Sequence, residues 1–273
     1  MTEESDSMTA SRPMLRPRMI AVANQKGGVG KTTTAINLGA AFAERGYETL
    51  LIDLDPQGNA STGLGCDVTD RTFTIHDVIS GEVSLLDSFC ETSQQRLRLV
   101  PASHKLSSFE MALANQEDRL NLLKDILFED NNLHDEFSYV LFDCPPALNL
   151  LTLNAMVAAH SVLAPLQAEF FALQGLSQLI SSMRQVRQSA NPHIHLEGVV
   201  LTMFDRRNNL SRQVESDARQ NLQQLVFKTV IPRAVRLSEA PSHGLPALHY
   251  DTRSAGSTAY RELADEILRN HTK

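Results

Sequence analysis

The sequence has little cysteine and no long apolar run. Its three cysteines, Cys66, Cys90 and Cys144, are scattered and odd in number, so they favour neither a disulfide framework nor a C-x-x-C metal site. No window approaches the run of about 18 apolar residues that a membrane-spanning helix needs. These absences argue against a disulfide-stapled secreted domain and against an integral membrane protein. A cytoplasmic protein in a reducing compartment is therefore expected.

The first part of the chain lacks a targeting signal. Residues 1–17 are polar, contain two prolines and have no apolar stretch of signal-peptide length. We expect a flexible tail there. The remaining residues, 18–273, are expected to form a single domain, because 42% of the 273 residues are hydrophobic and α/β folds often reach this size.

A variant of a phosphate-binding loop stands near the start of the chain, where residues 24–34 read N-Q-K-G-G-V-G-K-T-T-T. The usual pattern, G-x-x-x-x-G-K-[ST], uses glycines to curl backbone N–H groups around phosphates, a lysine for the outer phosphates and a hydroxyl for magnesium. Here Gln25 occupies the first glycine position, Lys31 is the usual lysine and Thr32 supplies the hydroxyl. An additional lysine, Lys26, precedes the usual one by five positions. The sequence therefore predicts a deviant Walker A loop with two lysines.

The flanking sequence supports this assignment. Residues 19–23 form a short apolar run typical of a buried strand, and residues 33–45 carry apolar side chains on one helical face before Gly46. Phosphates would then lie at a helix N-terminus, where free N–H groups and the helix dipole favour anions. The residues expected to bind the nucleotide here are Lys26, Gly27, Gly28, Val29, Gly30, Lys31, Thr32 and Thr33.

Two aspartates follow a second apolar strand, in the segment L-I-D-L-D-P-Q-G-N of residues 51–59. We expect Asp53 and Asp55 to have separate roles, with Asp55 facing the phosphate end of the sheet. A carboxylate there can orient water for in-line attack on a terminal phosphoryl group. An aspartate before a proline such as Pro56 is also typical of a turn, so a structural role for Asp55 is the alternative.

A third acid ends the apolar run Y-V-L-F-D of residues 139–143. Asp143 is in the Walker B position, where a carboxylate fixes Mg²⁺, usually through water because the ion gives up its hydration reluctantly. The neighbouring Cys144 invites a redox or metal interpretation. With no second cysteine nearby in the sequence, we expect a small buried hydrophobe instead.

Short apolar runs alternate with helical patterns along the rest of the chain. This alternation predicts an α/β fold with a mostly parallel twisted sheet and helices on both faces, which binds ligands at the carboxyl ends of its strands. The further strands are expected at residues 49–54, 97–101, 138–142, 161–165, 198–203 and 226–231. The further helices are expected at residues 119–128, 173–189, 211–225 and 257–270.

Four segments together resemble the ParA/Soj family of chromosome- and plasmid-partitioning ATPases, in the wider group that includes MinD. They are residues 23–38, 51–59, 142–146 and 231–244, and the resemblance runs from Met19 to about Leu268. It implies a P-loop NTPase fold and a Mg²⁺-dependent ATP hydrolase, with ATP and Mg²⁺ as cofactors.

In this family the ATP-bound form is a face-to-face dimer. The resemblance implies that Lys26 reaches the phosphates of the opposite subunit, and that Asp55, Lys26 and Lys31 serve catalysis. Thr32 and, through water, Asp143 would hold the metal. Adenine contacts would fall near Met203, Pro232 and Arg233.

The family resemblance also implies partners. The ATP-bound dimer would bind double-stranded DNA of the nucleoid without sequence preference, and a ParB-type centromere-binding protein would stimulate hydrolysis and release the monomer. The DNA-contacting arginines match Arg207 and Arg236. A net charge of −7 does not decide the matter, since non-specific binding needs only a local basic patch. The lead before residue 19 is too short for the helix-turn-helix of operator-reading relatives, so autorepression is not expected.

Other functions of the same fold remain as alternatives. A MinD-like membrane or cell-division regulator would need a basic amphipathic C-terminal helix, whereas residues 259–270 predict a core-packing helix without a basic face. An iron–sulfur carrier would need paired cysteines, and a ligase of the dethiobiotin-synthetase type would need a substrate pocket. Positioning of a cargo other than DNA also remains open. His243, which has no identifiable triad partners, is expected to structure its loop.

Overall fold

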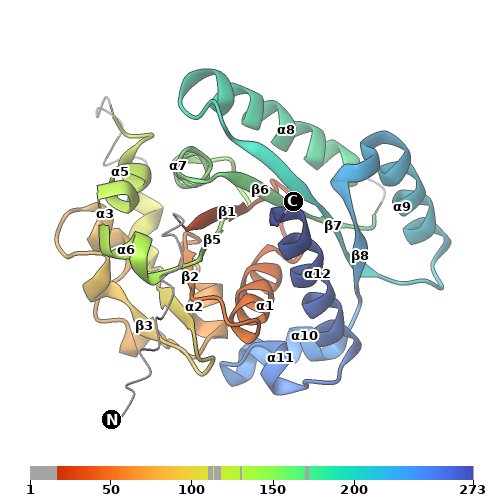
Figure 1. The fold of residues 1–273 in the computed structure, drawn as a ribbon, viewed down its shortest axis with the longest axis horizontal. Helices are drawn as coiled ribbons and strands as arrows, with labels where there is room; N and C mark the ends of the chain where they lie inside the picture. Colours follow the sequence, from red (N-terminus) through yellow and green to blue (C-terminus); the bar gives the residue numbers. More distant parts are fainter. Residues whose placement is uncertain (1–16, 110–112, 114–117, 130, 170–171, 273) are drawn as a thin grey trace, which may run out of the picture.

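The computed structural model describes residues 17–109, 113, 118–129, 131–169 and 172–272. Its centre is an eight-stranded sheet with the order β3-β4-β2-β5-β1-β6-β7-β8 (Figure 1). All neighbouring strands are parallel except β3, which is antiparallel to β4. The strands are β1 (Arg18–Val22), β2 (Thr49–Asp53), β3 (Cys90–Glu91), β4 (Leu97–Val100), β5 (Tyr139–Asp143), β6 (Ser161–Gln167), β7 (His195–Phe204) and β8 (Val226–Pro232). The predicted α/β fold is therefore confirmed.

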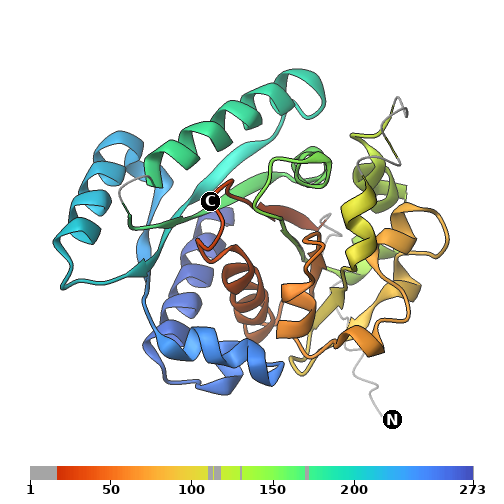
Figure 2. The same ribbon diagram turned by 180° about the vertical axis from the view of Figure 1, so that it is seen from behind.

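Helices cover both faces of this sheet, as Figures 1 and 2 show. They are α1 (Lys31–Glu44), α2 (Asn59–Gly63), α3 (Ile75–Ile79), α5 (Leu122–Glu129), α6 (Asn131–Glu136), α7 (Leu150–Ala158), α8 (Ala172–Ser189), α9 (Asn209–Leu222), α10 (Val235–Glu239), α11 (Ala247–Tyr250) and α12 (Ala255–His271). Within the described ranges, no helix combines the length and apolar character needed to cross a bilayer.

Alternation along β1 divides the apolar core into two layers. Met19 and Ala21 belong to the apolar cluster that also contains residues of α5, α7, α8 and α9. Ile20 and Val22 belong to the cluster that contains residues of α1, α11 and α12. Successive side chains of a strand point to opposite faces, and all four of these side chains are fully buried. Strand β1 is thus a central strand covered on both faces, which explains why the run before the loop is continuously apolar.

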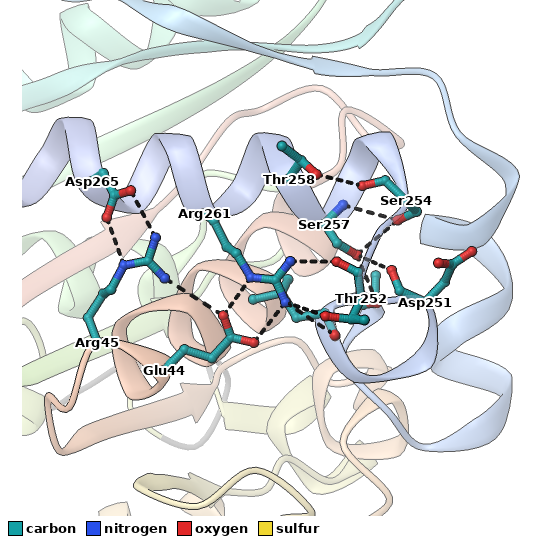
Figure 3. A network of polar contacts seen from close by, with 11 residues as sticks. Glu44, Arg45, Asp251, Thr252, Ser254, Ser257, Thr258, Arg261 and Asp265 are labelled. Atoms are coloured by element: carbon teal, nitrogen blue, oxygen red, sulfur yellow. Dashed lines mark hydrogen bonds and ion pairs between the residues drawn. The ribbon is translucent and has the colours of Figure 1, made fainter.

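Two bidentate ion pairs fasten α12 to α1 (Figure 3). Arg261 of α12 donates to both carboxylate oxygens of Glu44 at 2.6 and 2.9 Å. Arg45, which follows α1, donates to both oxygens of Asp265 at 2.8 Å. These contacts hold the C-terminal helix along the helix that begins at the phosphate-binding loop.

Buried contacts between the same two helices confirm that the C-terminal helix packs in the core, as expected. The hydroxyls of Thr34 and Tyr260 lie 3.1 Å apart, and Tyr260 is among the largest fully buried side chains of the described residues. Leu263 and Ile267 of α12 are also fully buried. Helix α12 therefore belongs to the layer that covers α1.

Several elements differ from the sequence-based expectation. Helix α7 was not expected, because it is buried on nearly every side and its sequence lacks a polar face that would mark the helical period. Strand β7 begins at His195 instead of residue 198. In this polar start the side chain of Glu197 is only 4% exposed, and it accepts a hydrogen bond from Ser161 Oγ at 2.6 Å. The expected flexible tail, residues 1–17, lies outside the described residues except for Pro17, which is buried.

Candidate active site

The phosphate-binding loop connects the end of β1 to the start of α1. Gly28 and Gly30 have φ angles of 74° and 85°, in the left-handed region that glycine enters without strain. Thr202 Oγ1 of β7 donates a hydrogen bond of 2.8 Å to the carbonyl of Val29, and Asn24 Nδ2 donates one of 2.7 Å to the carbonyl of Pro165. Strands β6 and β7 therefore fix the loop at the N-terminus of α1, where anions are favoured.

Lys31 and Asp143 place opposite charges beneath the loop. Lys31 Nζ donates to the Lys26 carbonyl at 3.2 Å, and burial lowers the pKa of Lys31 while the negative charge of Asp143 opposes that shift. Burial, together with the charges of Asp53 and Asp55, raises the pKa of Asp143 well above its usual range. A cation at this position would relieve the cost of ionising Asp143.

The surroundings of Asp143 fit a magnesium ion. Both carboxylate oxygens of Asp143 are buried without a hydrogen-bond partner among the described residues, and such groups are costly unless a ligand satisfies them. Thr32, at the start of α1, supplies a hydroxyl that helps to lower the pKa of Asp143. Carboxylate and hydroxyl oxygens with water are the ligands that Mg²⁺ prefers. Thr32 and Asp143 are therefore the residues that would hold the ion.

Asp53 and Asp55 have different surroundings. Asp53 Oδ2 accepts hydrogen bonds from Ser61 N at 2.9 Å and Ser61 Oγ at 2.7 Å, and Asp53 Oδ1 accepts one from Asp55 N at 3.1 Å. Burial raises the pKa of Asp53 to about 6. The strand ends at Asp53, so Asp55 leaves it and lines the cavity in front of the loop, where its Oδ1 accepts from Gln57 N at 3.0 Å. Asp55 is thus available to a ligand while also shaping the turn.

A cavity of about 620 Å³ lies in front of the loop. A smaller cavity of about 170 Å³ adjoins it, and both are lined by Gly30, Thr33 and Met203. Pro232 and Arg233, at the end of β8, line the smaller one. The three residues expected near adenine therefore lie together beside the loop. The two cavities form one groove, in which the larger cavity is the polar end and the smaller cavity is the more enclosed end.

Other residues of the groove were not assigned a role from the sequence. Gln57 and Asn59 belong to the aspartate-containing segment of residues 51–59, and Asn149 caps the N-terminus of α7. Ser107 lies in a segment whose sequence carries no recognisable motif. The predicted ligand residues that line the larger cavity are Gly27, Gly28, Gly30, Lys31, Thr32, Thr33 and Met203. Val29 is buried away from the cavity, so only its backbone is left to meet a phosphate.

The additional lysine is occupied within its own chain. Lys26 does not line either cavity, and its Nζ donates a hydrogen bond of 2.8 Å to Glu169 Oε2. Both side chains are partly exposed, with exposed fractions of 34% and 48%. The sequence offered no signal for Glu169, because it lies 143 positions from Lys26.

The two arginines matched to DNA contacts follow the carboxyl ends of β7 and β8. Arg207 has a side chain that is 91% exposed and is ion-paired to Asp205 at 3.1 Å. Arg236 pairs with Glu239 at 2.8 Å and lies over the ring of Tyr250. Both arginines are therefore at the surface, and both already have acidic partners.

Two residues considered from the sequence lie as expected for structural roles. The ring of His243 stacks on that of Tyr250 with centroids 4.7 Å apart, which fixes the loop after α10. Cys144 is buried beside Asp143, and burial raises the pKa of the Cys144 thiol.

Comparison with known proteins decides the family. A family model described as an AAA domain matches residues 17–196. Chromosome partitioning protein ParA of Caulobacter vibrioides is 53% identical over 251 residues, which cover 92% of this chain and 94% of that protein. The chain belongs to the ParA/Soj family of chromosome-partitioning ATPases. Sporulation initiation inhibitor protein Soj of Bacillus subtilis, another member, is 44% identical over 93% of this chain and 99% of its own length.

Solved structures confirm the P-loop NTPase fold of this ParA/Soj member. A crystal structure of cobyrinic acid a,c-diamide synthase from Mycobacterium smegmatis with bound ADP and magnesium matches with a TM-score of 0.81 and 37% identity, over 94% of this chain and 96% of that one. The cell division ATPase MinD of Pyrococcus furiosus matches with a TM-score of 0.75 and 27% identity, over 92% and 98%.

Proposed function

We propose that this protein is a DNA-partitioning ATPase that dimerises on ATP, binds DNA without sequence preference and is released by hydrolysis that a ParB-type partner stimulates. The observation that carries the proposal is the groove that joins the two-lysine loop, Asp55 and the Met203 region in front of an unpartnered Asp143. The related M. smegmatis structure holds ADP and magnesium, which supports ATP and Mg²⁺ as the cofactors here.

The chain's own groups divide the work of phosphoryl transfer. Backbone N–H groups of the loop and the N-terminus of α1 bind the phosphates, and Lys31 contacts the outer ones. A magnesium ion held by Thr32 and Asp143 would neutralise developing charge on the phosphates. Asp55, which lines the same cavity, orients the attacking water. Met203, Pro232 and Arg233 line the smaller cavity and hold the base.

Lys26 provides the link between nucleotide and dimer. Because it does not line the cavity of its own chain, it is free to serve a second copy once it leaves Glu169. A cation inserted from the partner makes the nucleotide part of the interface, and Gly27 and Gly28 allow the two backbones to approach closely. Dimerisation and nucleotide binding then depend on each other.

DNA binding is proposed for the edge of the sheet that carries Arg207 and Arg236. DNA phosphates would have to replace the acidic partners Asp205 and Glu239. Arg206, next to Arg207, is exposed, and no ion pair to it is found within the described ranges. Arg206 could therefore bind a DNA phosphate without first breaking an ion pair to an acidic side chain. Each subunit offers few such cations, so binding should require the dimer, where two patches act on one duplex.

The test measures DNA binding in the Asp55→Ala background, which should hold the ATP dimer together. Binding to unrelated duplexes is measured with ATP, ADP or no nucleotide, for the parent and for Arg206→Ala, Arg207→Ala and Arg236→Ala. Each removal should weaken binding by a similar factor on every duplex and lower the salt slope by roughly one. Arg96→Ala is the matched control, because Arg96 is exposed at the amino end of β4, away from the proposed edge.

Two results would overturn the DNA proposal. One is equal binding with ADP and ATP, and the other is unchanged affinity of all three arginine variants at physiological salt. Positioning of a cargo other than DNA would then become the better proposal, with the same ATP-driven dimer cycle.

An ATP-dependent amide ligase is the second candidate, favoured by the 37% identity to cobyrinic acid a,c-diamide synthase from M. smegmatis. The relatives named for partitioning match at higher identity, 53% and 44%. Phosphate release separates the two functions: a ligase turns over ATP with a small carboxylic acid and an ammonia donor, whereas a partitioning ATPase responds to DNA and its partner protein.

A further inference from the structure

Two cysteines that are 24 positions apart in the sequence meet at the edge of the sheet. Cys66 follows α2, and Cys90 begins the antiparallel edge strand β3. Both line a hollow of about 290 Å³, together with Arg71. Cys90 also packs on the apolar cluster that contains Cys66. This hollow is separate from the nucleotide groove, since the two have no lining residue in common.

The two thiols differ in access and in chemistry. Cys66 is 1% exposed, whereas Cys90 is half-buried and reachable from the hollow. The Cys90 thiol donates to the Glu91 carbonyl at 3.7 Å. The neighbouring Cys66 thiol and the positive charge of Arg71 lower the pKa of Cys90, against the effect of its partial burial. A thiol that is accessible from a hollow and lies beside a buried second thiol is the arrangement of an oxidisable pair.

We propose that Cys66 and Cys90 form a reversible dithiol–disulfide site, oxidised by a small peroxide that enters the hollow. Cys90 attacks hydrogen peroxide, and the O–O bond breaks to leave a sulfenic acid on Cys90 and one molecule of water. The Cys66 thiol then attacks the sulfenic sulfur, forming the S–S bond and releasing a second water. Two thiols lose two electrons in total, and one peroxide is reduced to two waters.

The disulfide would tie α2 to the edge strand. Cys66 N donates to the Ser61 carbonyl at 3.0 Å, so Cys66 closes the last turn after α2. Arg71 donates to the carbonyls of Cys66 and Gly58 at 3.1 and 3.3 Å, which connects both ends of α2. Oxidation should therefore reduce the mobility of the segment between Gly58 and Cys66. This inference does not depend on the proposed function, because it concerns thiol chemistry alone.

The experiment counts thiols in the full-length protein before and after a small excess of hydrogen peroxide. After peroxide is removed and the protein is denatured, free thiols should fall from three to one, and peptide mapping should find Cys66 linked to Cys90. A dithiol reductant should restore all three. Cys144 serves as the internal control, since it is buried, and its loss should be at least about tenfold slower.

Variants separate this pairing from other oxidation. Cys90→Ser should keep both remaining thiols under the same treatment, and Cys144→Ser should form the 66–90 link at the parental rate. Hydrogen exchange of residues 58–66 should slow on oxidation of the parent and stay unchanged in Cys90→Ser. The proposal is overturned if the native protein keeps three thiols, if a Cys90-to-Cys90 link between chains is the product, or if the 66–90 link forms no faster in native than in urea-unfolded protein.

Discussion

The ammonium of Lys26 lies 2.8 Å from a carboxylate oxygen of Glu169, so the lysine that distinguishes this loop is ion-paired within its own chain. If the proposed ATP dimer requires Lys26 in the other subunit, this ion pair must break on dimerisation. Glu169 then favours the monomer.

Glu169→Gln should therefore strengthen ATP-dependent dimerisation. The expected gain is about two- to thirtyfold in the dimer dissociation constant, because each subunit loses one such pair on dimerisation and an exposed ion pair contributes up to about 1 kcal/mol. Analytical ultracentrifugation with ATP and Mg²⁺ in the Asp55→Ala background measures it. Glu48→Gln, which removes an exposed ion pair to Arg96, is the matched control. Lys26→Ala should abolish the dimer while leaving ATP binding by the monomer largely intact, and a dimer in that variant would contradict the trans role.

Lys31→Ala should weaken ATP binding by about 10- to 100-fold, because a charge-assisted contact to the outer phosphates is lost. Its loss also leaves the buried Asp143 without its nearest cation. Isothermal titration with a slowly hydrolysed ATP analogue checks this expectation. Unchanged affinity would remove the assignment of the loop as the nucleotide site.

Asp55→Ala should bind ATP as well as the parent does and should lower turnover by about 100-fold or more, the effect of losing a positioned carboxylate. Asp55 lines the cavity, whereas Asp53 is fully buried and accepts hydrogen bonds from Ser61, so folding should be preserved when Asp55 is replaced. Phosphate release is the measurement. Normal partner-stimulated turnover would leave Asp55 with only its hydrogen bond to Gln57 N, as a turn former.

Glu197 should make stability depend on pH in the acidic range. Burial alone would raise the pKa of Glu197, but hydrogen bonds from His271 and Ser161 and the charge of Arg18 outweigh it and lower that pKa below its ordinary 4.5. A lowered folded-state pKa contributes stability above the unfolded value, and this stability is lost as the pH falls through the folded-state pKa.

The matching variant is Glu197→Gln, which should reduce the free energy of unfolding at pH 7 by about 2 kcal/mol. The difference from the parent should shrink as the pH falls from 4.5 towards the lower folded-state pKa, where the carboxyl of the folded parent also becomes neutral. Urea unfolding at several pH values measures it. A difference that stays constant across this range would show that shape, and not charge, makes Glu197 important.

The sequence predicted what depends on local pattern. The sequence correctly placed the loop after β1, Asp143 at the end of β5 and Asp55 after β2. Each of them ends or follows a buried strand, and parallel strands present their carboxyl ends at one edge of the sheet. The sequence could not predict the partners of these groups. Ser61, which donates hydrogen bonds to Asp53, lies in a short helix without a periodic pattern. Glu169, which pairs with Lys26, lies 143 positions away in the sequence.

Contacts between distant segments account for the remaining difference. Cys66 and Cys90 looked like isolated thiols in the sequence, and only the pairing of β3 with β4 brings Cys90 to the end of α2. The polar start of β7 was likewise not predicted as part of the strand, because Glu197 is held there by Ser161 and by His271 near the end of the chain. Such contacts follow from tertiary packing, which no local window contains.

The buried hydrogen bond between Thr34 and Tyr260 joins positions 226 residues apart, and it lies only three residues after Lys31. We expect the amide hydrogens on the face of α1 that α12 covers to exchange with solvent after α12 has detached, so the two helices should open as one cooperative unit. Ligands that bind the loop should slow exchange in α12 as strongly as in α1. The C-terminal helix would then report whether the nucleotide is bound.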